Sequence, residues 1–271
     1  MRTLAVALLL LGSSACKITR PFDPDPDVVA IGVLLVAGED EARLLAMHPH
    51  RERGEAAPKI TAELVGPGWR VAFSDTLPLE ACTAAEEWTG PTTCLRAALP
   101  ATIRGNVQYS LRGRAPLGSF GGRITVPAPP HLIAPPDTLR LTIPSHPELL
   151  GLVLRHEVGL DVGTLLVELL DAFETQEDGS VAEIPAERMG FSVKSIELRE
   201  SNVVSIRHRG RPVRFSLRLH GLGWRYTTFM RHRGRTDPLV RPWPNFGIDG
   251  EGAYGYFDGV GISRRAHIFL E

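Results

Sequence analysis

The chain lacks most of the motifs that identify common classes of enzyme. Its 271 residues contain no HExxH pair of histidines, no GxSxG nucleophile elbow and no GxxxxGK[ST] phosphate loop. Each of those motifs holds reactive groups in a fixed local geometry, so without them spacing alone identifies no catalytic residue. We therefore expect a protein that is not an enzyme.

The sequence also lacks the features of a helical membrane protein and of a nucleic-acid-binding protein. After residue 16, no apolar run is long enough to cross a bilayer as a helix. The formal net charge is −1, with 30 Lys and Arg against 31 Asp and Glu, so no overall positive charge attracts nucleic acid. We expect neither a transmembrane helix nor a nucleic-acid partner.

Cysteine is scarce, and the first of the three cysteines follows a segment with the layout of an export signal. Residues 1–15 contain one cation, Arg2, then a short apolar core and small residues. The expected cleavage point lies directly before Cys16, which resembles the lipobox of bacterial lipoproteins, with Ser13 where leucine is usual. We expect acyl chains on Cys16 that anchor the protein to a membrane. Plain secretion is the alternative.

The other two cysteines enclose a short polar stretch. Once Cys16 is lipidated, pairing Cys82 with Cys94 accounts for the odd cysteine count. A disulfide between them is expected in an oxidising compartment. A zinc site is the alternative, but it needs paired short spacings that these two cysteines do not provide.

Short apolar or alternating segments predict a mainly β fold. In VQYSLRG, Val107, Tyr109 and Leu111 alternate with polar residues, as in a strand with one buried face. The regular recurrence of such segments over about 100 residues suggests an immunoglobulin-like β-sandwich. We predict this sandwich followed by a second β-rich domain. For residues 163–173, the pattern fits an amphipathic helix as well as a strand.

Composition divides the chain into five parts. The signal segment at 1–15 precedes a Pro- and Asp-rich tether at 16–27, which favours an extended, solvated conformation. The sandwich covers residues 28–127. A proline-rich linker at 128–147 then leads to the second domain at 148–271.

Arginine replaces lysine almost everywhere and is concentrated in one region. Residues 203–241 contain ten arginines and a single acid, Asp237. Within this region RHRGR occurs twice, and its arginines are Arg207, Arg209, Arg211, Arg231, Arg233 and Arg235. If both copies lie at the same end of a sheet, they form a surface that binds anions. The alternative is two solvated turns whose arginines pair with acids elsewhere.

Several clusters suggest a metal or cofactor but lack the required pattern. The DPDPD tether has neither the glycine nor the glutamate of an EF-hand loop. Residues 250–255 match GxGxxG but follow no βαβ strand. The HPH triplet at 48–50 could join a metal site, although an exposed loop is expected, and Asp249, Glu251 and Asp258 could ligate calcium. We expect no cofactor and no metal.

Four segments of the chain carry a resemblance through their order. They are CK with a short spacer into VVAIGVLL, YSLRGRAPLGSFGGRITVPAPP, RYTTFMRHRGRTDPLVRPWPN and IDGEGAYGYFDG. In this order they resemble the bacterial envelope lipoproteins known as domain of unknown function 4249. The closing pattern of that family is matched, with extra residues inserted, by Asn245, Ile248, Gly250, Gly252, Gly255 and Phe257. The resemblance covers nearly the whole mature chain and implies a non-enzymatic outer-membrane partner of a nutrient-uptake system.

The expected protein is thus a lipid-anchored component of the bacterial envelope. It binds a ligand or assists an outer-membrane receptor or transporter, and Lys17 after the anchor is compatible with the outer membrane. One alternative is a hydrolase or carbohydrate-active enzyme whose carboxylates meet beside Trp224 or Trp243. Another is a module that binds an anionic polymer through residues 203–241.

Overall fold

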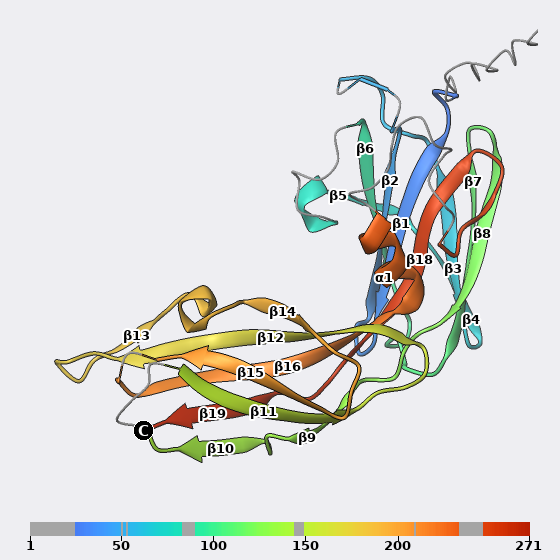
Figure 1. Cartoon of the computed structure of the whole chain (residues 1–271). Coiled ribbons are helices and arrows are strands. Elements are labelled where there is room, and N and C mark those ends of the chain that lie inside the picture. Colours follow the sequence, from blue (N-terminus) through green and yellow to red (C-terminus); the bar gives the residue numbers. More distant parts are fainter. Residues whose placement is uncertain are drawn as a thin grey trace, which may run out of the picture.

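The computed structural model shows two lobes built almost entirely of β-strands (Figure 1). It describes residues 25–49, 51–52, 54–82, 90–143, 149–208, 210–232 and 246–271. Within these ranges, no helix is both long and apolar enough to cross a membrane. The predicted fold class is confirmed, because the chain is mainly β and each lobe packs sheets around its own core.

The first lobe packs a five-stranded sheet against one part of a larger sheet. The five strands are, in order, β17 (Asp249–Gly250), β8 (Gly118–Thr125), β7 (Gln108–Ala115), β3 (Thr61–Gly66) and β4 (Trp69–Ala72). The larger sheet contributes to this lobe the strands β18 (Ala253–Ile262), β1 (Val29–Val36), β2 (Glu41–Met47), β6 (Thr92–Ala98) and β5 (Asp75–Leu77). A short 3-10 helix, η1 (Leu79–Ala81), follows β5.

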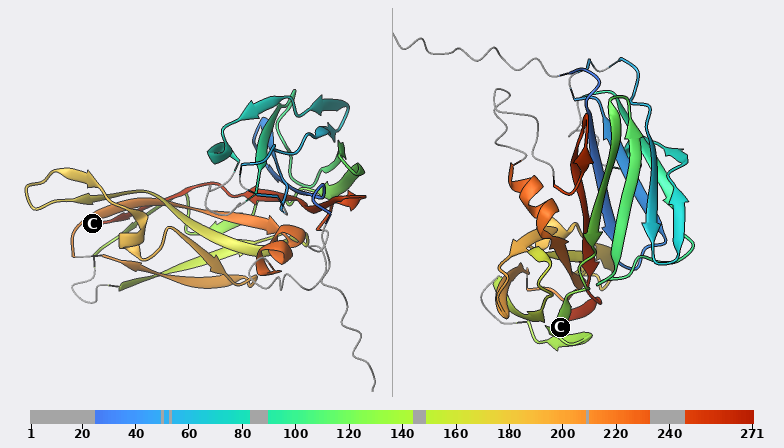
Figure 2. Two further views of the ribbon diagram at one scale, coloured as in Figure 1. Left: turned by 90° about the horizontal axis from the view of Figure 1, so that it is seen from above. Right: turned by 90° about the vertical axis from the view of Figure 1, so that its right-hand side faces the viewer.

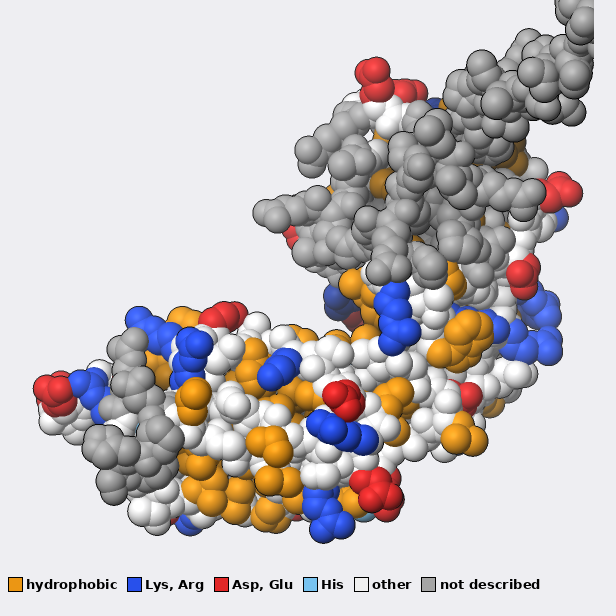
Figure 3. Space-filling model, viewed as in Figure 1, with side chains coloured by type: hydrophobic (Ala, Val, Ile, Leu, Met, Phe, Trp, Pro, Cys, Tyr) orange, Lys and Arg blue, Asp and Glu red, His pale blue; other side chains and the backbone are white. Residues whose placement is uncertain are grey.

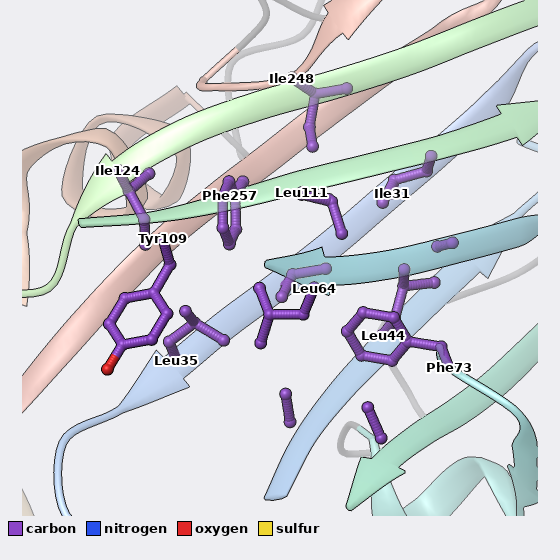
Figure 4. Close-up of a cluster of buried hydrophobic side chains, with 14 of the residues drawn as sticks. Ile31, Leu35, Leu44, Leu64, Phe73, Tyr109, Leu111, Ile124, Ile248 and Phe257 are labelled. Carbon is purple, nitrogen blue, oxygen red and sulfur yellow. The ribbon is translucent and has the colours of Figure 1, made fainter. Parts of the chain in front are cut away.

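The core of the first lobe draws on both ends of the chain. Tyr109 and Leu111, which alternate in β7, are each 1% exposed and face this core, as their spacing predicts. Ile248 and Phe257 belong to the same cluster and are fully buried (Figure 4). The predicted limits 28–127 therefore leave this sandwich incomplete, because local patterning gives no sign of pairing with a strand so distant in sequence.

The second lobe is another sandwich of two sheets. Its smaller sheet has the order β15 (Ser201–Arg207), β11 (Leu149–Glu157) and β9 (His131–Ala134). The facing strands belong to the larger sheet and are β13 (Val181–Glu183), β14 (Val193–Ile196), β12 (Val162–Thr175), β16 (Val213–Gly223), β19 (Ala266–Leu270) and β10 (Thr138–Leu141). A 3-10 helix, η3 (Ala186–Met189), and the helix α1 (Trp224–His232) complete the described elements. Residues 163–173 are therefore strand.

The predicted linker at 128–147 is wrong, because its described part contributes strands to both sheets of the second lobe. β9 pairs with β11, and β10 pairs with β19. Pro135 and Pro136 lie between these strands, so every residue within them keeps the N–H that sheet pairing needs.

β18 holds the two lobes together (Figure 2). Residues 253–260 of β18 pair in parallel with β1, and residues 260–262 pair with β16. The chain thus leaves the second lobe after β16, adds β17 and β18 to the first lobe, and returns as β19. The lobes are interlocked rather than joined in series.

A side chain of β18 also caps α1 at the junction. Oδ2 of Asp258 accepts a hydrogen bond from the backbone N–H of Tyr226 at 2.7 Å, and Oδ1 accepts one from Gly259 at 2.8 Å. Burial raises the pKa of the Asp258 carboxyl, although these hydrogen bonds oppose the rise. Gly223 must be glycine here, because an added Cβ would lie 2.0 Å from Oδ1 of Asp258. Asp258 therefore has a structural role.

Candidate ligand-binding cavity

A cavity of about 540 Å³ opens at the end of the second lobe that points away from the first. We call it the far cavity. Its walls come from the start of β11, the end of β12, the turn after β15 and the segment around η3. Basic and acidic side chains both lie at this end of the visible face (Figure 3). The cavity therefore lies where the two sheets of the second lobe cease to cover each other.

The far cavity contains a buried donor that has no partner among the described residues. His208 is 4% exposed, and its Nδ1 accepts a hydrogen bond from the backbone N–H of Gly210 at 3.3 Å. In the neutral ring the hydrogen therefore lies on Nε2. This atom has no hydrogen-bond partner among the described residues. A buried N–H left unpaired costs about 1–3 kcal/mol, which a bound acceptor would recover.

The facing sheet contributes a buried acceptor. Glu174, at the end of β12, is 6% exposed. Its Oε2 accepts a hydrogen bond from Nε2 of Gln176 at 3.3 Å and lies 3.9 Å from Nη1 of Arg211. Arg211 makes a shorter contact, 2.5 Å, with Glu177. The described polar partners of Glu174 therefore lie at long range.

The remaining walls are cationic at the mouth and apolar inside. Arg188 and Arg207 line the cavity and are exposed. Ile184, Met189 and Val213 line it with buried side chains. A positive rim, one buried donor, one buried acceptor and an apolar wall together suit a small polar molecule that has an apolar part.

The structure separates the two RHRGR copies. Arg207 and Arg211 lie beside the end of β12, where Arg211 pairs with Glu177. Arg231 lies in the last turn of α1 and lines a second cavity together with Gly163, at the start of β12. A strand of 14 residues spans roughly 40 Å. The condition for a single arginine surface is therefore not met by these three arginines, because the second copy begins in α1, and Arg211 pairs with an acid as the alternative expects. Arg209, Arg233 and Arg235 lie outside the described residues.

A second cavity, of about 510 Å³, lies beside α1 and is lined by basic side chains. Lys194, Arg199 and Arg231 line it, and its one acid, Glu197, pairs with Arg199 at 3.3 Å. The buried amide in its wall, Asn202, accepts from the N–H of Glu197 at 3.2 Å and donates to its carbonyl at 2.9 Å. No buried polar group of the described lining residues needs a ligand, so the far cavity is the stronger candidate.

The cysteine prediction is confirmed where the structure describes it. Cys82 and Cys94 form a disulfide with their Cα atoms 5.8 Å apart. The bond ties the end of η1 to β6. Cys16 lies outside the described residues, so its lipidation stays a prediction.

The acids and histidines that suggested a metal do not converge. Asp258 caps α1, whereas Asp249 lies in β17 and Glu251 is exposed. His48 directly follows β2 and is 3% exposed, so it is buried and not in the expected exposed loop, and its Nδ1 lies 3.2 Å from a backbone carbonyl oxygen. His50 is outside the described residues. Over the described ranges, no group of three or more potential metal ligands is present.

Comparisons with known proteins found weak similarity to solved structures and nothing else. Neither a family model nor a curated protein matches the chain. The chain is similar to the N-terminal Ig1-2 module of the Drosophila receptor protein tyrosine phosphatase DLAR, with 11% identity, coverage of 90% of this chain and 99% of that chain, and a TM-score of 0.29. It is also similar to the chicken interferon gamma receptor alpha chain, with 12% identity, coverage of 91% of this chain and 99% of that chain, and a TM-score of 0.24. Such weak similarity carries no information on function.

Proposed function

We propose that the protein is a non-enzymatic binding component of the bacterial envelope, anchored through acyl chains on Cys16. It works at the outer membrane with a receptor or transporter and presents the far cavity to a small ligand. The Pro- and Asp-rich tether gives reach, and the two interlocked lobes hold the cavity at a distance from the anchor.

The position of the far cavity carries this proposal. The described chain enters the first lobe at β1. The start of β1 pairs with the first residues of β18, whereas the last residues of β18 pair with β16 of the second lobe. The far cavity lies at the opposite end of the second lobe (Figure 1). A binding site at the end of the second lobe, away from the place where the described chain enters β1, suits capture or transfer of a ligand.

The groups that line the far cavity favour binding over catalysis. Glycoside hydrolysis uses a pair of carboxylates, and covalent catalysis needs a nucleophile beside a base. Among the described lining residues there is one carboxylate, Glu174, and one imidazole, His208. They are not paired with each other and come from facing sheets.

The test is purification of the protein from its native membrane. Mass spectrometry would identify both the N-terminal residue and the proteins that co-purify, with C16S as the control that cannot be acylated. A diacylated or triacylated Cys16 together with an outer-membrane receptor or transporter would support the proposal. A soluble, unmodified chain, or a lipidated chain with no envelope partner, would overturn it.

A further inference from the structure

We infer that the far cavity binds a small zwitterion with a primary amine, a carboxylate and an aliphatic body, such as a free aliphatic amino acid. This inference deepens the proposed function and rests on it for the biological role of the site. It uses each of the four features that line the cavity, which are the buried acceptor, the buried donor, the cationic rim and the apolar wall.

The amine would bind at Glu174. Glu174 lines the cavity and is 6% exposed, so few water molecules can contact its carboxylate, and close donors from a ligand would stabilise it. The contacts of Glu174 with Gln176 and Arg211, at 3.3 and 3.9 Å, lie beyond the usual length of a charge-assisted hydrogen bond. An ammonium group from a ligand would supply both the missing charge and the missing hydrogen bonds.

The carboxylate would bind on the opposite side, at His208 and the rim. Nε2–H of His208 is buried and has no partner among the described residues, so it offers one hydrogen bond to an acceptor. Arg188 and Arg207 line the same cavity, and guanidinium groups match the fork of a carboxylate. The facing sheets of a sandwich lie roughly 10 Å apart, so side chains that point inward from both can reach the two ends of one small molecule.

The apolar wall and the size select the body of the ligand. Ile184, Met189 and Val213 are buried and line the cavity, so an aliphatic side chain would be removed from water there. A volume of about 540 Å³ lies in the range of small-molecule sites. It accommodates an amino acid or a short peptide and not a folded partner.

Three probes of nearly equal shape test the inference on the unchanged full-length protein. Leucine carries both charges, 4-methylpentanoate lacks the amine, and 3-methylbutylamine lacks the carboxylate. Binding is measured by calorimetry and by the methyl NMR signal of Met189, with Met47 of the first lobe as the internal control. We expect leucine to move the Met189 signal in a saturable way and to bind about tenfold or more tightly than either analogue.

Two substitutions in the cavity and one outside it assign the contacts. E174Q keeps the shape of the side chain and removes its charge, so leucine should then bind no more tightly than 4-methylpentanoate. H208L removes the Nε2–H donor and should weaken leucine and 4-methylpentanoate by the same factor. R70Q is the matched control, because Arg70 pairs with Glu63 in the first lobe at 3.5 Å, and it should leave all three affinities unchanged.

Several results would overturn the inference. The first is the absence of a saturable shift of the Met189 signal with leucine. The second is equal affinity of the unchanged protein for leucine and 4-methylpentanoate. The third is equal affinity of E174Q and R70Q for leucine. The probe series needs no variant, so misfolding of E174Q would not decide the outcome. If leucine binds but the chain proves to be unlipidated, the amino-acid site is supported and the proposed function is rejected. If the chain is lipidated and has an envelope partner but does not bind leucine, the proposed function is supported and the amino-acid site is rejected.

Discussion

Replacing Phe257 with alanine tests whether β18 completes the first lobe. Phe257 is fully buried and packs in the first core with Leu44 and Leu64, which precede it by about two hundred residues. A buried Phe→Ala change costs about 3–5 kcal/mol, from lost transfer free energy and the cavity left behind. For a chain of this size that corresponds to a fall in melting temperature of roughly 6–20 °C.

Hydrogen exchange read by mass spectrometry locates the effect of F257A. The first-lobe strands β3, β7 and β8 should lose protection, although they lie far from the substitution in sequence. F269A is the matched control, because Phe269 is only half-buried, on the outer face of the second lobe beneath the Arg140 guanidinium. F269A should produce a smaller loss, confined to the second lobe. Unchanged protection of β3, β7 and β8 in F257A would refute the interlocked arrangement.

Three further predictions concern the disulfide and two titratable groups. Replacing Cys82 and Cys94 with serine should cost on the order of 3 kcal/mol in the chain-entropy model, measured by denaturant unfolding with and without reductant. Burial lowers the pKa of His156, so its stabilising effect is complete above its ordinary pKa of 6.5 and is lost as pH falls through the folded value. H156Q should reduce the dependence of the unfolding free energy on pH between pH 7.5 and 5. If this dependence is the same in H156Q as in the control H131Q, the prediction is contradicted. Burial raises the pKa of Glu168, but hydrogen bonds from Arg218 and His220 outweigh this effect and lower it. E168Q should therefore reduce the unfolding free energy more at pH 7 than at pH 3.5.

Strand type and local burial could be predicted because they depend on neighbouring residues. The alternation of Val107, Tyr109 and Leu111 gives the buried face of β7 correctly for Tyr109 and Leu111. The disulfide follows in the same way, since Cys82 and Cys94 are close in sequence and a short loop brings them together. Both inferences need no knowledge of distant pairing.

Long-range pairing and the far cavity could not be predicted. The parallel register that places Ala253 opposite Val29 depends on packing across the whole chain, and no local periodicity encodes it. Glu174 opens the acidic stretch ETQEDGS, whose composition is typical of an exposed loop, yet it is buried where β12 ends. His208 is found only as part of RHRGR, and its burial depends on the facing sheet. The cavity exists because segments far apart in sequence end at the same place.

Tension between an anchored N-terminus and a ligand held in the far cavity would follow a defined route through the molecule. It would enter along β1, cross to β18 and pass through β16 into the second lobe, because β18 pairs with both. β1 and β18 are parallel over eight residues, and the two strands would be pulled at opposite ends. Their hydrogen bonds would then be loaded in shear, all at once and not one after another. The same pairing that closes the first core would thus make the protein a stiff mechanical link.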